Sequence, residues 1–136
     1  MDFRALEKYQ PQLRAILRIV VALLFMEHGL AKLFHFPVAQ PGAPDPLPTI
    51  LLAAAIIEVV AGGLIVLGLF TRLAAFIAAG EMAVAYFMFH APNGFWPIVN
   101  MGEGAILYCF VFLYLAAAGP GAWSVDAARV KNAPIR

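Results

Sequence analysis

Ionisable side chains lie inside stretches of sequence that are otherwise apolar, and these side chains are the ones that can support chemistry. Each of four apolar stretches contains a glutamate, and the first glutamate is followed by a histidine: Glu27, His28, Glu58, Glu81 and Glu103. A second group lies nearer the ends of the stretches: Lys32, His35, His90 and Asn100. In lipid, an ionisable group at mid-helix costs about 2.5–3.5 kcal/mol on insertion scales. Each of these residues therefore needs a partner or a function.

The composition indicates that the elements around these residues lie in a membrane. Of the 136 residues, 63% are hydrophobic and 12% are charged, whereas soluble domains average about 45–50% apolar and about 25% charged residues. We therefore predict a single membrane domain over residues 1–136. The net charge of +1 provides no field that attracts nucleic acid. A single cysteine, Cys109, excludes an intramolecular disulfide.

Four apolar stretches are close to the length of about 20 residues that spans a hydrocarbon core: residues 13–34, 47–69, 73–89 and 98–118. Five prolines in residues 36–48 prevent helix between the first two stretches. The short link at residues 68–72 requires a tight hairpin, with Thr71 expected as the N-cap of the third helix, and Ser124 is expected to cap a short tail helix. The predicted fold is all-α, an antiparallel four-helix transmembrane bundle.

The basic residues predict the orientation of this bundle. Eight of the nine Lys and Arg residues fall on one side of the four spans, and only Lys32 falls on the other. The positive-inside rule then places both the N- and C-termini in the cytoplasm, in the inner membrane of a bacterium. Arg14, Arg18 and Arg72 are expected to extend toward the cytoplasmic headgroups.

If the four helices run antiparallel, most of the polar residues lie at a similar depth in the membrane. Six of them fall in the non-cytoplasmic half: His28, Lys32, His35, His90, Asn100 and Glu103. Glu58 and Glu81 lie near the middle. The simplest arrangement is an interior in which Glu58 and Glu103 lie opposite Lys32 and His28.

Helical spacing predicts which of these residues share a face. Ala54, Glu58 and Gly62 form a ridge of small residues around an acid, which suits close helix contact within the bundle or between copies in a homo-oligomer. Glu81 and His90 are nine residues apart, or about 180° on an ideal helix, so both can face the interior only if the helix bends.

Short motifs in order along the chain resemble those of the DoxX family, small four-span membrane proteins. The motifs are FMEHG at residues 25–29, KLF at 32–34, EVVAGG at 58–63, GLFTR at 68–72, His90, NMGE at 100–103 and GPGAWSVD at 119–126. Met101 replaces a glycine that is frequent in the family. Because similar proteins are linked to quinol oxidase and thiosulfate:quinone oxidoreductase systems, the resemblance implies a small subunit or quinone-interacting accessory of a membrane oxidoreductase, with a redox protein as partner.

The polar cluster has two interpretations. In the structural one, Lys32 neutralises Glu58 or Glu103 and His28 adds a hydrogen bond. Four glutamates outnumber the cations of the cluster, so at least one carboxyl is expected to hold a proton. In the functional one, a quinone occupies an apolar slot. The residues assigned to that slot are His28, Lys32 and Asn100 as donors, Glu58 or Glu103 for proton exchange, Phe25 or Phe34 against the ring, and Glu27 and Glu81 as a proton relay.

Other chemistries receive less support from the sequence. A haem would need two facing histidines such as His28 and His90, and histidines near span ends more often lie at the membrane interface. No HxxxH or ExxH spacing supports a metal site. A proton- or solute-coupled transporter would use the same glutamates as relays, and a purely structural assembly partner is the third alternative. No nucleophile–base pair occurs in the sequence, so no reaction is assigned.

Overall fold

The computed structural model describes residues 2–132, and all regular secondary structure in this range is helical. Four long helices form the body of the molecule: α1 (Gln10–Phe34), α2 (Thr49–Leu67), α3 (Thr71–Ala85) and α5 (Glu103–Ala118). Five short elements accompany them: the 3-10 helix η1 (Phe3–Tyr9), the π-helix η2 (Tyr86–His90), the 3-10 helix η3 (Ala91–Asn93), α4 (Pro97–Asn100) and α6 (Val125–Lys131). The predicted all-α class is confirmed.

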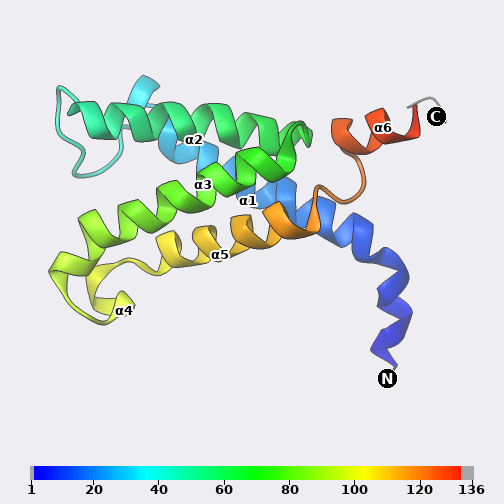
Figure 1. Ribbon diagram of the computed structural model, residues 1–136. Helices are drawn as coiled ribbons and strands as arrows, with labels where there is room; N and C mark the ends of the chain where they lie inside the picture. The colour runs from blue at the N-terminus through cyan, green and yellow to red at the C-terminus, as the bar shows by residue number, and fades with distance from the viewer. Residues whose placement is uncertain (1, 133–136) are drawn as a thin grey trace.

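The long helices pack as two pairs, α1 with α2 and α3 with α5, and α2 joins the pairs through α3 (Figure 1). Both ends of the described chain lie at one end of the bundle together with α6, and α4 and the loop between α1 and α2 lie at the other. The core is rich in small residues that allow close helix packing: Ala22, Ala61, Ala74, Ala75, Ala78, Ala79 and Ala105, filled by Phe25, Ile65, Met82, Phe112 and Leu115.

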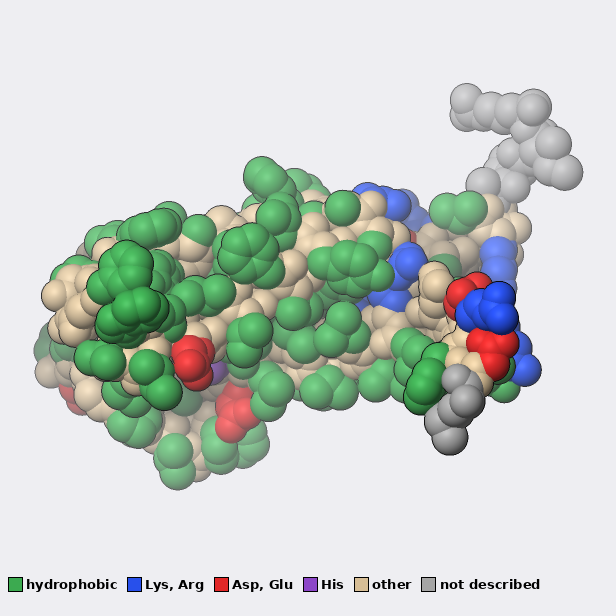
Figure 2. All heavy atoms as spheres, turned by 90° about the horizontal axis from the view of Figure 1, so that it is seen from below, with side chains coloured by type: hydrophobic (Ala, Val, Ile, Leu, Met, Phe, Trp, Pro, Cys, Tyr) green, Lys and Arg blue, Asp and Glu red, His purple; other side chains and the backbone are tan. Residues whose placement is uncertain are grey.

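Two helical segments within residues 2–132 are long and apolar enough to cross a membrane, Thr49–Leu67 and Thr71–Asn93. Glu103–Ala118 is apolar but shorter. The 25-residue α1 is long enough, but it carries four charged side chains: Arg14, Arg18, Glu27 and Lys32. Hydrophobic side chains are spread along the face in Figure 2, and Lys and Arg side chains gather, with some acidic ones, at the end where the described chain begins and ends.

The third helix changes its geometry near its end. After Ala85 it continues as the π-helix Tyr86–His90. The wider turn shifts the angular position of the residues that follow. This is the departure from an ideal helix that Glu81 and His90 need in order to face the same space.

The fourth apolar stretch is not the continuous helix expected over residues 98–118. α4 ends at Asn100, Met101 adopts a left-handed conformation with φ of 59°, and α5 begins at Glu103. The amide oxygen of Asn100 accepts a hydrogen bond of 2.8 Å from the backbone N–H of Gly102. A Cβ at Gly102 would lie 2.5 Å from the ring of Tyr86, so only glycine fits where this break packs against the end of α3.

Arg18 is fully buried, and the expectation that it extends toward headgroups is wrong. Its guanidinium donates to five backbone carbonyls, of Ile65, Val66, Pro120, Ala122 and Trp123, at distances of 2.6–3.2 Å. The first two belong to the last turn of α2, where carbonyls lack partners within the helix. The carbonyl of Ile65 also accepts the N–H of the capping residue Gly68 at 3.1 Å, and Arg18 supplies the further donors at this helix end.

The start of α3 is capped by a residue from α6. Thr71 was expected as the N-cap, but the backbone N–H groups of Phe70 and Thr71 donate to the carboxylate of Asp126 at 3.0 and 2.9 Å. Burial raises the pKa of Asp126, but these hydrogen bonds and the charge of Arg129 outweigh it and bring the pKa below its ordinary value. Ser124 caps α6 as predicted, accepting from the N–H of Ala127 at 3.1 Å.

Candidate functional site

A buried ion pair between α1 and α2 forms the centre of the candidate site. Lys32 Nζ lies 2.6 Å from Oε1 and 2.8 Å from Oε2 of Glu58. The side chains are only 9% and 3% exposed. Two opposite charges at this distance are tolerated in a low-dielectric interior, where either one alone would be strongly unfavourable.

Glycines at the helix crossing explain why the two partners meet. A Cβ at Gly29 of α1 would lie 2.7 Å from the carbonyl oxygen of Ala55 and 2.9 Å from Cβ of Glu58. A Cβ at Gly62 of α2 would lie 3.0 Å from Cβ of Met26. The missing side chains let the backbones approach closely, so the Gly62 end of the predicted ridge contacts α1.

The ion pair borders a cavity of about 360 Å³, which we call the glutamate cavity. Side chains from all four long helices and from the loop between α1 and α2 line it. The polar ones are His28, Lys32, Gln40, Glu58, Glu81 and His90, and the larger apolar and aromatic ones are Leu51, Met82, Phe89, Met101 and Tyr108. Its volume falls within the range of about 300–1,000 Å³ that is typical of small-molecule sites.

Two acceptors in this lining have no donor. Oε2 of Glu81 and Oε1 of Gln40 are both buried, and neither forms a hydrogen bond to any of residues 2–132. Buried acceptors are almost always satisfied in native proteins, so an unpaired one needs an explanation. Two residues of the lining thus carry acceptors that the described chain leaves unpaired.

Glu81 and His90 both line the glutamate cavity, although ideal helical geometry would put them on opposite faces. Between them lies the π-helix η2. His90 Nδ1 is 3.0 Å from the carbonyl oxygen of Asn100, and its ring stacks on Tyr86 with centroids 6.4 Å apart. The histidine is therefore held in place by its neighbours at the end of α3.

Asn100 is 3% exposed and does not line the cavity, in contrast to its expected role as a ligand donor. Its amide nitrogen donates to the carbonyl of Gly94 at 2.9 Å and to the hydroxyl of Tyr86 at 3.3 Å. Together with its bond from Gly102, these contacts fix the loop before α5. Asn100 is thus a positioning residue for His90.

Glu103 and Glu27 are exposed, and neither lines the glutamate cavity. The expectation of Glu103 in the interior opposite Lys32 is wrong because α5 begins at this residue. Glu103 lies in the first helical turn, where a negative charge interacts favourably with the helix dipole. His28 is also exposed but does line the cavity, and its ring packs edge-on against Tyr108 at 6.0 Å.

The aromatic lining differs from the one expected. Phe25 is fully buried against Phe112, with centroids 4.8 Å apart, and Phe34 is 68% exposed. Phe89 and Tyr108 line the cavity instead. Helical periodicity could not predict that Gln40 lines the cavity, because Gln40 lies in the proline-rich loop. Tyr108 could have been predicted, because it lies one turn from Ala105 on the inner face of α5. Among the described residues, no group of three His, Cys, Asp or Glu side chains could hold a metal ion.

Comparison with known proteins identifies the family. The DoxX family model matches residues 13–91, which contain Lys32, Glu58, Glu81 and His90. The chain belongs to the DoxX family. This DoxX protein is 49% identical over 128 residues to an uncharacterized protein of Haemophilus influenzae, covering 89% of this chain and 93% of the relative.

Two further relatives come from Escherichia coli. Inner membrane protein YphA is 36% identical over 134 residues, covering 86% of this chain and 90% of YphA. Inner membrane protein YqjF is 31% identical over 121 residues, covering 82% and 87%. No solved structure matches the chain. This DoxX protein is therefore a membrane protein with relatives in the inner membrane.

Proposed function

We propose that this DoxX protein binds a quinone or quinol in the glutamate cavity and serves as a small accessory subunit of a membrane oxidoreductase assembly. The observation that carries the proposal is the unpaired, buried Oε2 of Glu81, a residue that lines the glutamate cavity beside the Lys32–Glu58 pair. A quinol hydroxyl can donate the hydrogen bond that this oxygen lacks. The side chains of Phe89 and Tyr108 provide apolar and aromatic surface for the ring.

The polar groups suit both redox forms of such a ligand. An ammonium has three donors, and Glu58 accepts from Lys32 with two oxygens, so one N–H of Lys32 is free for a quinone carbonyl. Oxidation of a quinol releases two protons and two electrons. Glu81 takes up one proton at Oε2, a histidine of the lining (His28 or His90) takes up the other, and the two electrons pass to the redox partner in the assembly.

A lipid-soluble ligand can reach this cavity from the side. A second cavity of about 240 Å³ lies between α2 and α3, and Glu81 lines both cavities. Its other walls are almost entirely apolar, among them Ile57, Val84 and Phe89. A Cβ at Gly80 would meet nothing within 4 Å. The gap between α2 and α3 therefore suits the isoprenoid tail of a quinone that enters from the bilayer.

The proposed topology is four transmembrane spans, α1, α2, α3 with η2, and α5, with both termini in the cytoplasm. Two of the charges that make α1 unlike an ordinary span are accommodated inside the protein, because Arg18 donates to backbone carbonyls and Lys32 pairs with Glu58. Lys and Arg side chains gather at one end of the bundle (Figure 2), as the positive-inside rule requires. Arg136 belongs to the same predicted group but lies outside the described residues.

Organic extraction of gently purified protein tests the proposal. The extract is separated by chromatography and its absorbance is compared before and after reduction with borohydride. We expect a quinone at close to one equivalent per chain, and a marked reduction when Glu81→Leu is purified in the same way. The matched control is Glu27→Leu, which removes an exposed carboxylate from α1 and should retain the quinone. Extracts without quinone, together with no binding of added ubiquinone-1 or menadione, would contradict the proposal.

The alternative functions give different results. A proton or solute flux in proteoliposomes that Glu58→Gln abolishes would support a transporter. A purely structural partner would lose thermal stability with changes at the Lys32–Glu58 pair and would show no ligand-dependent signal in any variant.

A further inference from the structure

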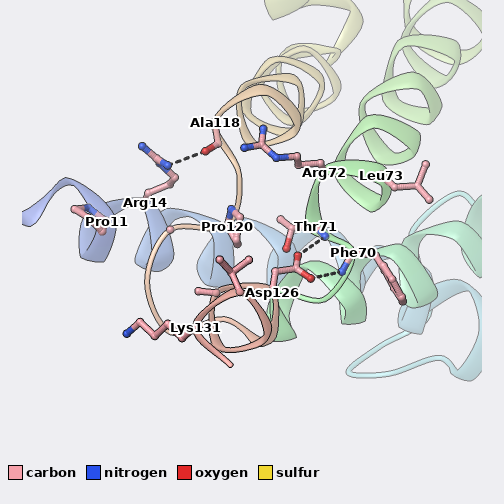
Figure 3. Close-up of a pocket in the computed structure, with 13 residues that line it drawn as sticks. Pro11, Arg14, Phe70, Thr71, Arg72, Leu73, Ala118, Pro120, Asp126 and Lys131 are labelled. Carbon is pink, nitrogen blue, oxygen red and sulfur yellow. Dashed lines mark hydrogen bonds between the residues drawn. The ribbon is translucent and has the colours of Figure 1, made fainter. Parts of the chain in front are cut away.

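A larger cavity, of about 760 Å³, lies at the opposite end of the bundle from the glutamate cavity. We call it the basic cavity. It is a depression open to the surface, bordered by the starts of α1 and α3, the end of α5, and α6 (Figure 3). Its charged lining residues are Arg14, Arg72, Lys131 and Asp126.

Two arginines approach the end of α5 from different sides (Figure 3). Arg14 Nη1 donates to the carbonyl of Ala118 at 2.8 Å, and Arg72 Nη1 donates to the carbonyl of Ala116 at 3.1 Å and to that of Ala117. Each guanidinium has five N–H donors, so these bonds orient the cations and leave most donors free. Nε of Arg14 is buried without an acceptor among residues 2–132. The basic cavity therefore offers oriented, unused donors.

The one acidic residue in this lining is already engaged. Both oxygens of Asp126 accept backbone N–H groups at the start of α3, from Phe70 and Thr71. Three cations against one occupied carboxylate give the lining an excess of positive charge. The complementary ligand is an anion.

The same cavity has an apolar side. Phe70, Leu73 and Val130 line it and are 56%, 63% and 77% exposed. Phe70 and Leu73 lie at the start of α3, next to its apolar outer surface. A free anion would gain nothing from these side chains, whereas an anionic molecule with a hydrocarbon chain would bury them.

We propose that the basic cavity binds the headgroup phosphate of an anionic phospholipid, with its acyl chains running over Phe70 and Leu73. Arg72 contacts the phosphate, and Arg14 and Lys131 contribute positive charge from the two sides of the cavity (Figure 3). Basic pockets between helices at the cytoplasmic surface recognise such headgroups. The lipid thereby joins α6 to the start of α3, beside the contact that Asp126 makes.

Native mass spectrometry of the purified protein in mild detergent tests this assignment. The protein is titrated separately with phosphatidylglycerol, phosphatidylcholine and inorganic phosphate. We expect one preferred site for phosphatidylglycerol, at least about tenfold tighter than for phosphatidylcholine, since each basic side chain near a headgroup contributes about 1 kcal/mol. Inorganic phosphate should not displace the lipid, because it cannot bury the apolar side.

Variants locate the site. Lys131→Gln should weaken phosphatidylglycerol binding about fivefold, and Arg72→Gln combined with Lys131→Gln about thirtyfold. The matched control is Lys8→Gln, which removes one exposed positive charge from η1 at the same end of the molecule but outside the cavity. If the double variant does not fold, the phosphatidylglycerol affinity of Lys131→Gln alone tests the assignment.

Three results would overturn the assignment. Equal affinity for phosphatidylglycerol and phosphatidylcholine would show that charge is not recognised. Equal weakening by Lys8→Gln and Lys131→Gln would show a diffuse attraction in place of a site. Displacement of the lipid by inorganic phosphate would make a free anion the ligand.

Discussion

Arg18 and Glu81 are both polar side chains placed among apolar helices, yet their surroundings differ. Arg18, at the end of the bundle that carries α6, is fully buried and donates to five carbonyls. Glu81, in the glutamate cavity, has a buried oxygen with no donor from residues 2–132. A side chain that satisfies its neighbours is part of the structure, whereas one that is left unsatisfied beside a cavity is available to a ligand.

Groups of both kinds occur at each end of the molecule. At the basic end, side chains complete the hydrogen bonding of helix ends, as Asp126 does for α3 and Arg18 does for α2. In the glutamate cavity, only the Lys32–Glu58 pair is internally balanced. Changes at the engaged groups, Arg18, Asp126 and the Lys32–Glu58 pair, should therefore reduce stability, whereas changes at Glu81 should reduce ligand binding.

The largest loss of stability is expected from Arg18→Met. The change removes the donor from five carbonyls, and each buried group left unpaired costs about 1–3 kcal/mol. We expect a loss of about 4 kcal/mol or more in the free energy of unfolding, seen as a sharply lower Tm or failure to accumulate in the membrane. Lys8→Met, an exposed change nearby, should leave Tm unchanged. An Arg18→Met protein as stable as the parent would contradict the structural role of Arg18.

Lys32→Met should be the next most harmful change. Removing one partner of a buried ion pair typically costs about 3–5 kcal/mol, because the other charge is left unpaired. Adding Glu58→Leu removes that charge as well, and the double variant should recover most of the lost Tm. Thermal unfolding of the single and double variants measures the coupling. Additive losses would show that the two side chains do not act as a pair.

Asp126→Ala should lower the free energy of unfolding by a smaller amount, about 1–2 kcal/mol, which is typical of a lost helix cap. Folding lowers the pKa of Asp126 below its ordinary value of 3.8. Its contribution to stability is therefore complete above that value and is lost as the pH falls through the lower native pKa. The difference in Tm between parent and variant should be constant near neutral pH and should narrow in acid. A difference that widens in acid would contradict the capping role.

Sequence patterns predicted the helices well because apolar length and proline positions are local properties. The all-α class, the cap at Ser124 and the proximity of Lys32 to Glu58 all follow from spacing and charge. The break at Met101 was missed because it depends on Gly102 packing against Tyr86, a contact between distant segments. The fully engaged role of Arg18 was missed for the same reason, since its acceptors are more than 40 residues away.

The cavity residues, too, could be predicted from the sequence only in part. The glutamates stand out in an apolar sequence, but which of them faces inward depends on where each helix begins and how it bends. Glu103 points outward because α5 starts there, and the π-helix lets His90 share a cavity with Glu81. Gln40 reaches the cavity from a loop, where no periodicity applies.

The most direct test of the account measures the stability and ligand affinity of Glu81→Leu together. Thermal unfolding is recorded with and without a short-chain quinol, with Glu27→Leu as the control. Because the parent leaves a buried carboxylate oxygen unpaired, we predict that Glu81→Leu has an equal or higher Tm and binds the quinol at least about tenfold more weakly. A lower Tm with unchanged quinol affinity would contradict the account.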